Sequence, residues 1–314
     1  MAINKEINMK KIWITASDGM VGKSLIRRLK NDNKYKVIST NRRDFDQTIQ
    51  ASVEEWLKLN SPDHIIICSS LVGGIHYNDS ASAEILYTNS QINLNIINSA
   101  FKNGCRNLIF LGASCMYPKN VNQPLDENSL MAGKIEETNL GYGLSKILGA
   151  NLVELYNKQY NTSYKCIIPA ASYGPNDCFD DKKNHVIPAL MNKIHIAKIE
   201  NKSSINVWGS GNALREFIHV DDMADGIIYI MENYKGKSSI NLGSGEEVSI
   251  RTLVKALCKI INYNGDINYD TSKPEGVKRK ILNSSKLQEI GWFPKIPLEK
   301  GLEEMYEYYK DTFK

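Results

Sequence analysis

The sequence predicts an α/β fold in which a doubly wound parallel sheet is followed by a smaller α/β lobe. Apolar runs typical of strands alternate with helical stretches through the first half of the chain. This alternation favours βαβ units, in which helices cover both faces of a parallel sheet. The length of 314 residues exceeds the usual size of one domain. A ligand of such a sheet is expected at the carboxyl ends of its strands.

The expected elements follow the hydrophobic periodicity along the chain. In the first half we expect strands at Lys11–Thr15, Lys36–Thr40, His64–Ser69, Asn107–Gly112 and Tyr164–Ile168. The helices between them include Lys23–Lys30, Ala83–Phe101 and Tyr142–Tyr160. After about residue 175 the pattern loosens, with short strands at Ile205–Trp208, Ser239–Leu242 and Asp266–Tyr269. We therefore expect residues 1–175 to form mainly the first domain and 176–314 mainly the second lobe, with some later segments returning to the first.

Composition excludes several classes of protein. An apolar fraction of 42% and a charged fraction of 24% are ordinary for a soluble globular protein. The net charge of +4 is small and the basic residues are scattered, which argues against nucleic acid as a partner. We find no signal-peptide pattern and no apolar run of membrane-spanning length, so we expect a cytoplasmic protein without a membrane partner. The six cysteines lack metal-site spacing, so neither disulfides nor a structural metal is expected.

The segment IWITASDGMVG (12–22) resembles a dinucleotide-binding turn of a Rossmann-type sheet, with one glycine replaced. Such a turn uses three glycines: one for the tight turn, one for approach of the pyrophosphate and one for packing of the helix on the strand. Here Ala16 holds the first position, while Gly19 and Gly22 hold the others. The extra methyl group is tolerable if Ala16 keeps a negative φ.

The end of the second strand indicates which dinucleotide binds. An NAD site usually has an acidic residue there that binds the ribose 2′-hydroxyl. The sequence STNRRD instead offers Arg42 and Arg43. Guanidinium groups suit a 2′-phosphate, which favours NADP; the alternative is a pair of solvated loop arginines.

The stretch GYGLSK indicates a catalytic pair of residues. Tyr142 and Lys146 lie four residues apart at the start of an apolar-periodic helix, so their side chains share one helical face. A free phenol has a pKa near ~10, and an adjacent ammonium group stabilises its phenolate. The pair therefore predicts acid–base catalysis by Tyr142, with Lys146 lowering its pKa.

The chain resembles the extended short-chain dehydrogenase/reductases, and among them the GDP-L-fucose synthase family, over roughly residues 10–310. The stretches that carry this resemblance are GMVGKSLIRRL (19–29), LVGGI (71–75), FLGASCMYPK (110–119), NHVIPALM (184–191), VWGSGNALREFIHVDDMA (207–224) and SKPEGVKRK (272–280). Such enzymes invert C3 and C5 of a GDP-4-keto-6-deoxy-mannose and then reduce C4 with NADPH. The resemblance implies a role in nucleotide-sugar biosynthesis for surface glycans and a homodimer formed through Ala83–Phe101 and Tyr142–Tyr160.

The resemblance also assigns roles to single residues. The resemblance places Cys115 and His185 as the acid–base pair of the epimerisation. Such a pair can invert C3 and C5, because the ketone acidifies the hydrogens on both neighbouring carbons. Tyr142 donates the proton in the reduction, and Lys146 orients the nicotinamide ribose. Contacts with the cofactor are expected from Ala16, Ser17, Gly19, Met20, Val21, Gly22, Arg42, Arg43, Leu111, Gly112, Lys146, Pro169, Ser172 and His185. Contacts with the GDP-sugar are expected from Trp208, Arg215, Glu275 and Lys193, the last at a position where the family usually has arginine.

Three alanines depart from the family pattern. Ala113 replaces the catalytic serine or threonine, Ala171 replaces an asparagine, and Ala16 replaces the first glycine. Ser114 could supply the missing hydroxyl only after a backbone shift, since neighbouring strand residues face opposite ways. Three functions stay open: a C4 reductase of a GDP-4-keto-6-deoxy hexose or heptose with or without epimerase activity, a full epimerase–reductase, and a non-catalytic NADP-binding protein.

Overall fold

A six-stranded parallel sheet forms the centre of the larger lobe in the computed structural model, which describes residues 9–180, 183–273 and 276–313. Its strands lie in the order β2-β1-β3-β4-β5-β9. Their bounds are β1 Lys10–Ile14, β2 Tyr35–Ser39, β3 His64–Ile67, β4 Asn107–Leu111, β5 Ser163–Pro169 and β9 Ile240–Leu242. The predicted strands are confirmed to within one or two residues at each end.

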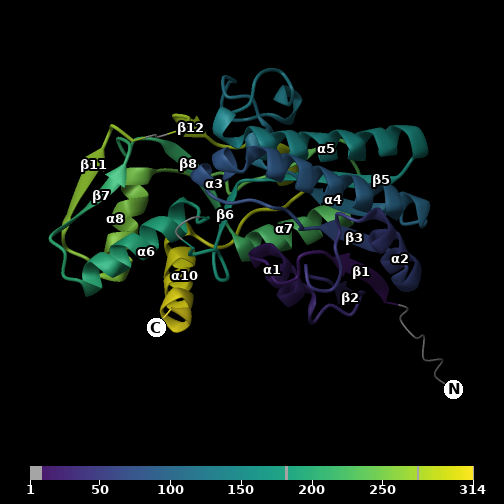
Figure 1. Cartoon of the computed structure of the whole chain (residues 1–314), viewed down its shortest axis with the longest axis horizontal. Helices are drawn as coiled ribbons and strands as arrows, with labels where there is room; N and C mark the ends of the chain where they lie inside the picture. The colour runs from purple at the N-terminus through teal and green to yellow at the C-terminus, as the bar shows by residue number, and fades with distance from the viewer. Residues whose placement is uncertain (1–8, 181–182, 274–275, 314) are drawn as a thin grey trace.

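Helices cover both faces of this sheet, as the prediction of a doubly wound fold requires. Helix α1 (Met20–Leu29) packs against α7 (Val220–Asn233) on one face, and α4 (Ser82–Lys102) packs against α2 (Gln50–Asn60) and α5 (Leu140–Tyr160) on the other. Figure 1 shows α4 and α5 running side by side. All three helices predicted in the first half are confirmed.

The strand order reverses between β1 and β3, since the chain passes from β1 to β2 on one side and continues through β3 to β5 on the other. Ligands of doubly wound sheets bind outside the carboxyl ends of the strands at such a switch point. Three connections leave the carboxyl ends of the strands next to this switch point: the turn after β1, the segment with the short helix α3 (Ile75–Ser80) after β3, and the 3₁₀ turn Ser114–Met116 after β4.

A smaller lobe lies beside one end of the sheet (Figure 1). Its strands β6 (Ala171–Tyr173), β8 (Leu214–His219), β10 (Glu247–Ser249) and β12 (Arg279–Lys280) form one sheet, and β7 (Ser204–Trp208) pairs with β11 (Asp266–Asp270). Helices α6 (Val186–Ile199), α8 (Ile250–Ile261) and α10 (Leu298–Thr312) bury the second apolar cluster with these strands.

Two separate apolar clusters form the interior. The first contains the central strands together with residues of α7, β9 and the short helix α9 (Ser285–Glu289), so later segments of the chain complete the larger lobe. The second belongs to the smaller lobe. All six cysteines are free thiols. None of the helices among the described residues is both long and apolar enough to span a membrane.

Candidate active site

The turn after β1 adopts a conformation that the sequence did not anticipate. Ala16 has φ = +50°, so the expectation of a negative φ at this residue is wrong. The left-handed conformation brings the Ala16 carbonyl under the first turn of α1, where a Cβ atom on Gly22 would lie only 2.3 Å from the Ala16 oxygen. Close packing of helix on strand therefore sets the geometry here, and an L-residue in this conformation carries strain.

The amino terminus of α1 is open for an anion. Gly19 caps the helix without a side chain, and no side-chain hydrogen bond satisfies the first N–H groups of Met20 and Val21. The backbone of Ser17 donates a 2.9 Å hydrogen bond to the Thr40 oxygen, which ties the turn to the end of β2. Uncapped N–H groups at a helix start form a ready site for phosphate groups.

The loop after β2 presents two exposed guanidinium groups, as predicted. Arg42 Nη2 lies 3.5 Å from the Ser70 carbonyl oxygen, in the loop that follows β3. The acid of this loop, Asp44, accepts a 2.6 Å hydrogen bond from the Asn41 backbone N–H and so serves the turn. Together with Arg43, these groups leave positive charge at the place where an NAD site carries an acid.

Tyr142 and Lys146 lie on one face of α5, with Lys146 Nζ 5.5 Å from the centre of the Tyr142 ring. Lys146 is buried and donates a 2.8 Å hydrogen bond to the Leu111 oxygen at the end of β4. Burial lowers the pKa of Lys146 to about 8. Burial also raises the pKa of Tyr142 above its ordinary value, so the predicted lowering of this pKa is wrong. The phenol consequently stays protonated and can act as an acid.

Cys115 lies against this pair. Its side chain is buried in the 3₁₀ turn after β4. Burial raises the pKa of its thiol, while the charges of Lys280 and Lys146 lower it by a smaller amount. Ser114 begins the same 3₁₀ turn, so the strand alternation assumed in the sequence analysis does not govern where its hydroxyl points. Ala113, in extended conformation, precedes the turn and carries no hydroxyl.

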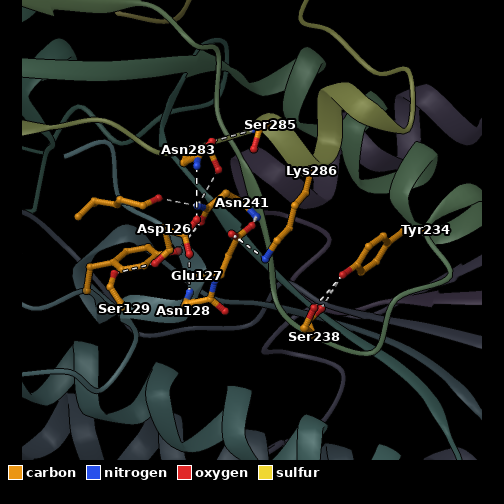
Figure 2. A network of polar contacts seen from close by, with 12 residues as sticks. Asp126, Glu127, Asn128, Ser129, Tyr234, Ser238, Asn241, Asn283, Ser285 and Lys286 are labelled. Carbon is orange, nitrogen blue, oxygen red and sulfur yellow. Dashed lines mark hydrogen bonds and ion pairs between the residues drawn. The ribbon is translucent and has the colours of Figure 1, made fainter. Parts of the chain in front are cut away.

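A buried polar network fixes the segment that follows Cys115 (Figure 2). Asn241 of β9 accepts a 2.6 Å hydrogen bond from the Tyr117 hydroxyl, and its backbone N–H donates to Glu127 Oε1 at 2.9 Å. The other oxygen of Glu127 pairs with Lys286 at 3.0 Å, and the Glu127 side chain is only 5% exposed. These contacts tie the segment that follows Cys115 to β9 and to α9.

His185 precedes helix α6, and its partner is Asp177. The two side chains are 4.0 Å apart, with the imidazole half exposed and the carboxyl group buried. Burial lowers the pKa of His185 and raises that of Asp177 to about 7. The loop before His185 joins the region after β3, because the Gly74 N–H donates a 2.9 Å hydrogen bond to the Lys183 oxygen. The chain thus brings an imidazole to the same edge of the sheet.

The predicted substrate residues occupy different parts of the smaller lobe. Trp208 is 46% exposed and its ring contacts His76 of α3 edge to face. Arg215 pairs in register with Lys280 across β8 and β12. Lys193 donates to the Asn206 oxygen on β7 at 3.0 Å. Glu275 lies outside the described residues.

The remaining predicted cofactor contacts lie at strand ends. Leu111 accepts the Lys146 hydrogen bond, and the Gly112 N–H donates to the Ile167 oxygen on β5. Pro169 ends β5, and Ser172 lies in β6, which follows directly. Ala171, the third departure from the family pattern, is exposed in β6.

Three residues of this region have no role in the sequence analysis: Ser70, Asp177 and Lys280. The Ser70 hydroxyl lies beside Tyr142 and lowers its pKa. Lys280 lies close enough to Cys115 to lower the pKa of its thiol. The sequence offers only weak signals for these three residues. Ser70 lies three residues after β3, Asp177 lies in the loop before His185, and Lys280 lies in the stretch SKPEGVKRK. Their contacts join distant segments, so local patterns do not indicate them.

Comparison with known proteins agrees with this geometry. The model of the NAD dependent epimerase/dehydratase family matches residues 12–243. A probable GDP-L-fucose synthase from Oryza sativa subsp. japonica is 39% identical over 303 residues, covering 96% of this chain and 92% of the relative. The chain belongs to the NAD dependent epimerase/dehydratase family, and within it to the GDP-L-fucose synthase family.

Solved structures of this family share the whole fold. A GDP-6-OMe-4-keto-L-xylo-heptose reductase from C. jejuni superposes with a TM-score of 0.91 at 30% identity, covering 96% of this chain and 98% of that one. A GDP-mannoheptose C4 reductase from Campylobacter jejuni, solved with NADP bound, gives a TM-score of 0.87 at 32% identity, with coverage of 96% and 98%. The predicted α/β fold and family are confirmed.

Proposed function

We propose that this protein is an NADPH-dependent reductase that acts on C4 of a GDP-4-keto-6-deoxy sugar. The observation that carries the proposal is the pair of Tyr142 and the buried Lys146 at the carboxyl edge of the sheet, next to Cys115. The similarity to a GDP-L-fucose synthase and to GDP-heptose reductases supports a GDP-sugar as the substrate class.

The residues present fit an NADP molecule. The uncapped start of α1 offers N–H groups to the pyrophosphate, and hydrogen in place of a side chain at Gly22 lets the turn pack closely. Arg42 and Arg43 suit the 2′-phosphate, and Lys146 lies where it can bind the nicotinamide ribose. When bound, the reduced nicotinamide supplies the hydride that the reduction needs. We assign the cofactor role to residues 1–175 and the substrate role mainly to 176–314.

The protein's own groups then handle the proton. Tyr142 enters the reaction as a neutral phenol, because burial raises its pKa, and it donates its proton to the C4 oxygen as negative charge develops there. The buried Lys146 ammonium stabilises the phenolate that remains and is held in place by the Leu111 oxygen. The one proton that the oxygen of the alcohol product gains thus comes from Tyr142.

The second candidate function is the full epimerase–reductase reaction, favoured by Cys115 and His185. Burial keeps the thiol neutral and disfavours protonation of the imidazole, so one group can give and the other can take a proton at neutral pH. A 4-keto group acidifies the hydrogens at C3 and C5, which makes inversion through an enolate accessible to such a pair. Product analysis separates this activity from reduction alone.

We infer that the diphosphate and the base of the substrate bind in the smaller lobe. Arg215 and Lys280 place two cations side by side on β8 and β12, which suits a diphosphate. Trp208 offers an exposed ring for stacking of the base, next to His76. Lys193 lies farther along, on α6.

The experiment is an assay of NADPH consumption with two substrates, GDP-4-keto-6-deoxy-mannose and its heptose counterpart, followed by analysis of the products. Oxidation of NADPH with either sugar, and a product reduced at C4, supports the proposal. Inverted C3 or C5 in the product supports the second candidate function. Tight NADPH binding without turnover of either sugar supports the non-catalytic alternative and contradicts the proposal.

We further infer a homodimer formed through the outer surfaces of α4 and α5. These helices cover the sheet with one face and expose large apolar side chains on the other, among them Tyr87, Leu94, Leu148 and Leu155. Leu148→Asp combined with Leu155→Asp should convert a dimer into a monomer in light scattering. A parent protein that is monomeric at working concentration contradicts this inference.

A further inference from the structure

Reduction of a carbonyl group places negative charge on an oxygen atom that accepts more than one hydrogen bond. Tyr142 supplies one donor. A second preorganised donor at such an oxygen typically contributes ~10²–10³ in rate. Ala113, two residues after the end of β4, has no side-chain donor. With Tyr142 alone, the C4 oxygen therefore lacks a second hydrogen-bond donor.

A hydroxyl group of the required kind lies beside Tyr142. The Oγ atom of Ser70 is buried, and among the described residues no partner meets the distance and angle of a full hydrogen bond to it. The Ser70 and Tyr142 side chains are neighbours, and this contact acts to lower the pKa of Tyr142 against the larger effect of burial. Buried hydroxyl groups rarely stay unpartnered, so a ligand atom at this position is the natural acceptor.

The backbone on both sides of Ser70 is fixed. The Ser69 N–H donates a 2.9 Å hydrogen bond to the buried Thr15 hydroxyl. On the other side, Asn89 of α4 accepts from the Leu71 N–H at 2.6 Å and donates to the Leu71 oxygen at 2.9 Å. A hydroxyl held between two such anchors is preorganised, which is the property that makes a donor effective in catalysis.

Strand register relates Ser70 to Ala113. The last pair of β3 and β4 joins Ile67 to Phe110. Ser70 follows the end of β3 by three residues and Ala113 follows the end of β4 by two, so both lie at the carboxyl edge of paired strands. Neighbouring strands lie about 4.8 Å apart. Ser70 and position 113 therefore approach the same edge of the sheet, each from the loop after one of two neighbouring strands.

We propose that Ser70 is a catalytic residue whose hydroxyl donates the second hydrogen bond to the C4 oxygen of the substrate, alongside Tyr142. This assignment rests on the proposed C4 reduction. It explains how the chain retains an oxygen-binding pair although Ala113 contributes none. No covalent step falls to Ser70, since the proton comes from Tyr142.

The test compares Ser70→Ala with the double variant Ser70→Ala/Ala113→Ser, using GDP-4-keto-6-deoxy-mannose and its heptose counterpart. We expect Ser70→Ala to lower kcat by ~10²-fold or more, with a nearly unchanged KM. Ala113→Ser in the same chain should restore kcat to within about tenfold of the parent, because it returns a hydroxyl from the neighbouring strand. NADPH affinity, measured by fluorescence without sugar, should be the same in all three proteins.

Ser99→Ala is the matched control. Ser99 is also a buried serine whose hydroxyl lacks a partner among the described residues, but it lies near the far end of α4. This variant should keep the parental kcat. The assignment is overturned if Ser70→Ala retains parental kcat, if Ala113→Ser fails to restore it, or if Ser70→Ala weakens NADPH binding. A parent that oxidises no NADPH with either sugar contradicts the proposed function itself, a result distinct from an active parent with an equally active Ser70→Ala.

Discussion

Nδ1 of His185 lies 4.0 Å from Oδ1 of Asp177, and the carboxyl group of this pair is the buried partner. Burial raises the pKa of Asp177 to about 7, whereas a free aspartate titrates near 3.8. The folded protein therefore binds a proton at Asp177 more tightly than the unfolded chain does. The contribution of Asp177 to the free energy of unfolding is fully present below the pKa of the unfolded chain and is lost as pH rises towards 7.

Asp177→Asn should remove this dependence on pH. We expect the free energy of unfolding of the variant, relative to the parent, to increase by about 2–3 kcal/mol between pH 5 and pH 8. Urea unfolding at the two pH values measures this change. Asp79→Asn, which alters an exposed carboxylate of α3, is the control and should show no such increase. A constant difference between Asp177→Asn and the parent at both values would show that the carboxyl group is not perturbed.

Ala16→Gly should stabilise the protein. The φ of +50° at Ala16 is unfavourable for a residue with a Cβ atom, and glycine removes this strain at a smaller cost in chain entropy. The expected gain is about 0.5–1 kcal/mol in the free energy of unfolding, measured in urea. Ala81→Gly is the control, because Ala81 has φ = −107° and glycine there should destabilise the protein. Destabilisation by both substitutions would contradict the strain at Ala16.

Arg42→Ala combined with Arg43→Ala should remove the preference for NADPH over NADH. Charge-assisted hydrogen bonds to a phosphate contribute ~1.5–3 kcal/mol each, so the Kd for NADPH should rise steeply while that for NADH changes little. Fluorescence titration with both cofactors measures the two constants. Lys58→Ala, an exposed cation on α2, serves as control. Equal affinity of the parent for NADPH and NADH would exclude the role of the arginines.

Tyr142→Phe should nearly abolish reduction without preventing cofactor binding. The substitution removes the proton donor and retains the ring over which Lys146 lies, so a loss of at least ~10²-fold in rate is expected. NADPH oxidation measures the rate, and fluorescence measures NADPH binding. Tyr263→Phe removes a phenol of the smaller lobe whose hydroxyl donates a 3.1 Å hydrogen bond to the Lys202 oxygen, and this variant should behave as the parent. Reduction by Tyr142→Phe at the parental rate would show that another group is the acid.

The sequence by itself determined the order and type of the elements. Strand and helix periodicities extend over five to twenty residues, so they are visible in one segment without its neighbours. The i, i+4 spacing of Tyr142 and Lys146 likewise fixed their common face on α5, and the glycines at 19 and 22 marked the start of α1.

The tertiary structure decided the electrostatics and the partners. Ala16 takes a positive φ because α1 packs on the end of β1, and burial reverses the expected direction of the Tyr142 pKa. The pairing of Arg215 with Lys280 depends on strand register between residues about sixty apart. Ser70, in the loop after β3, lies beside Tyr142 of α5. Burial and register arise from contacts between distant segments, which local periodicity does not encode.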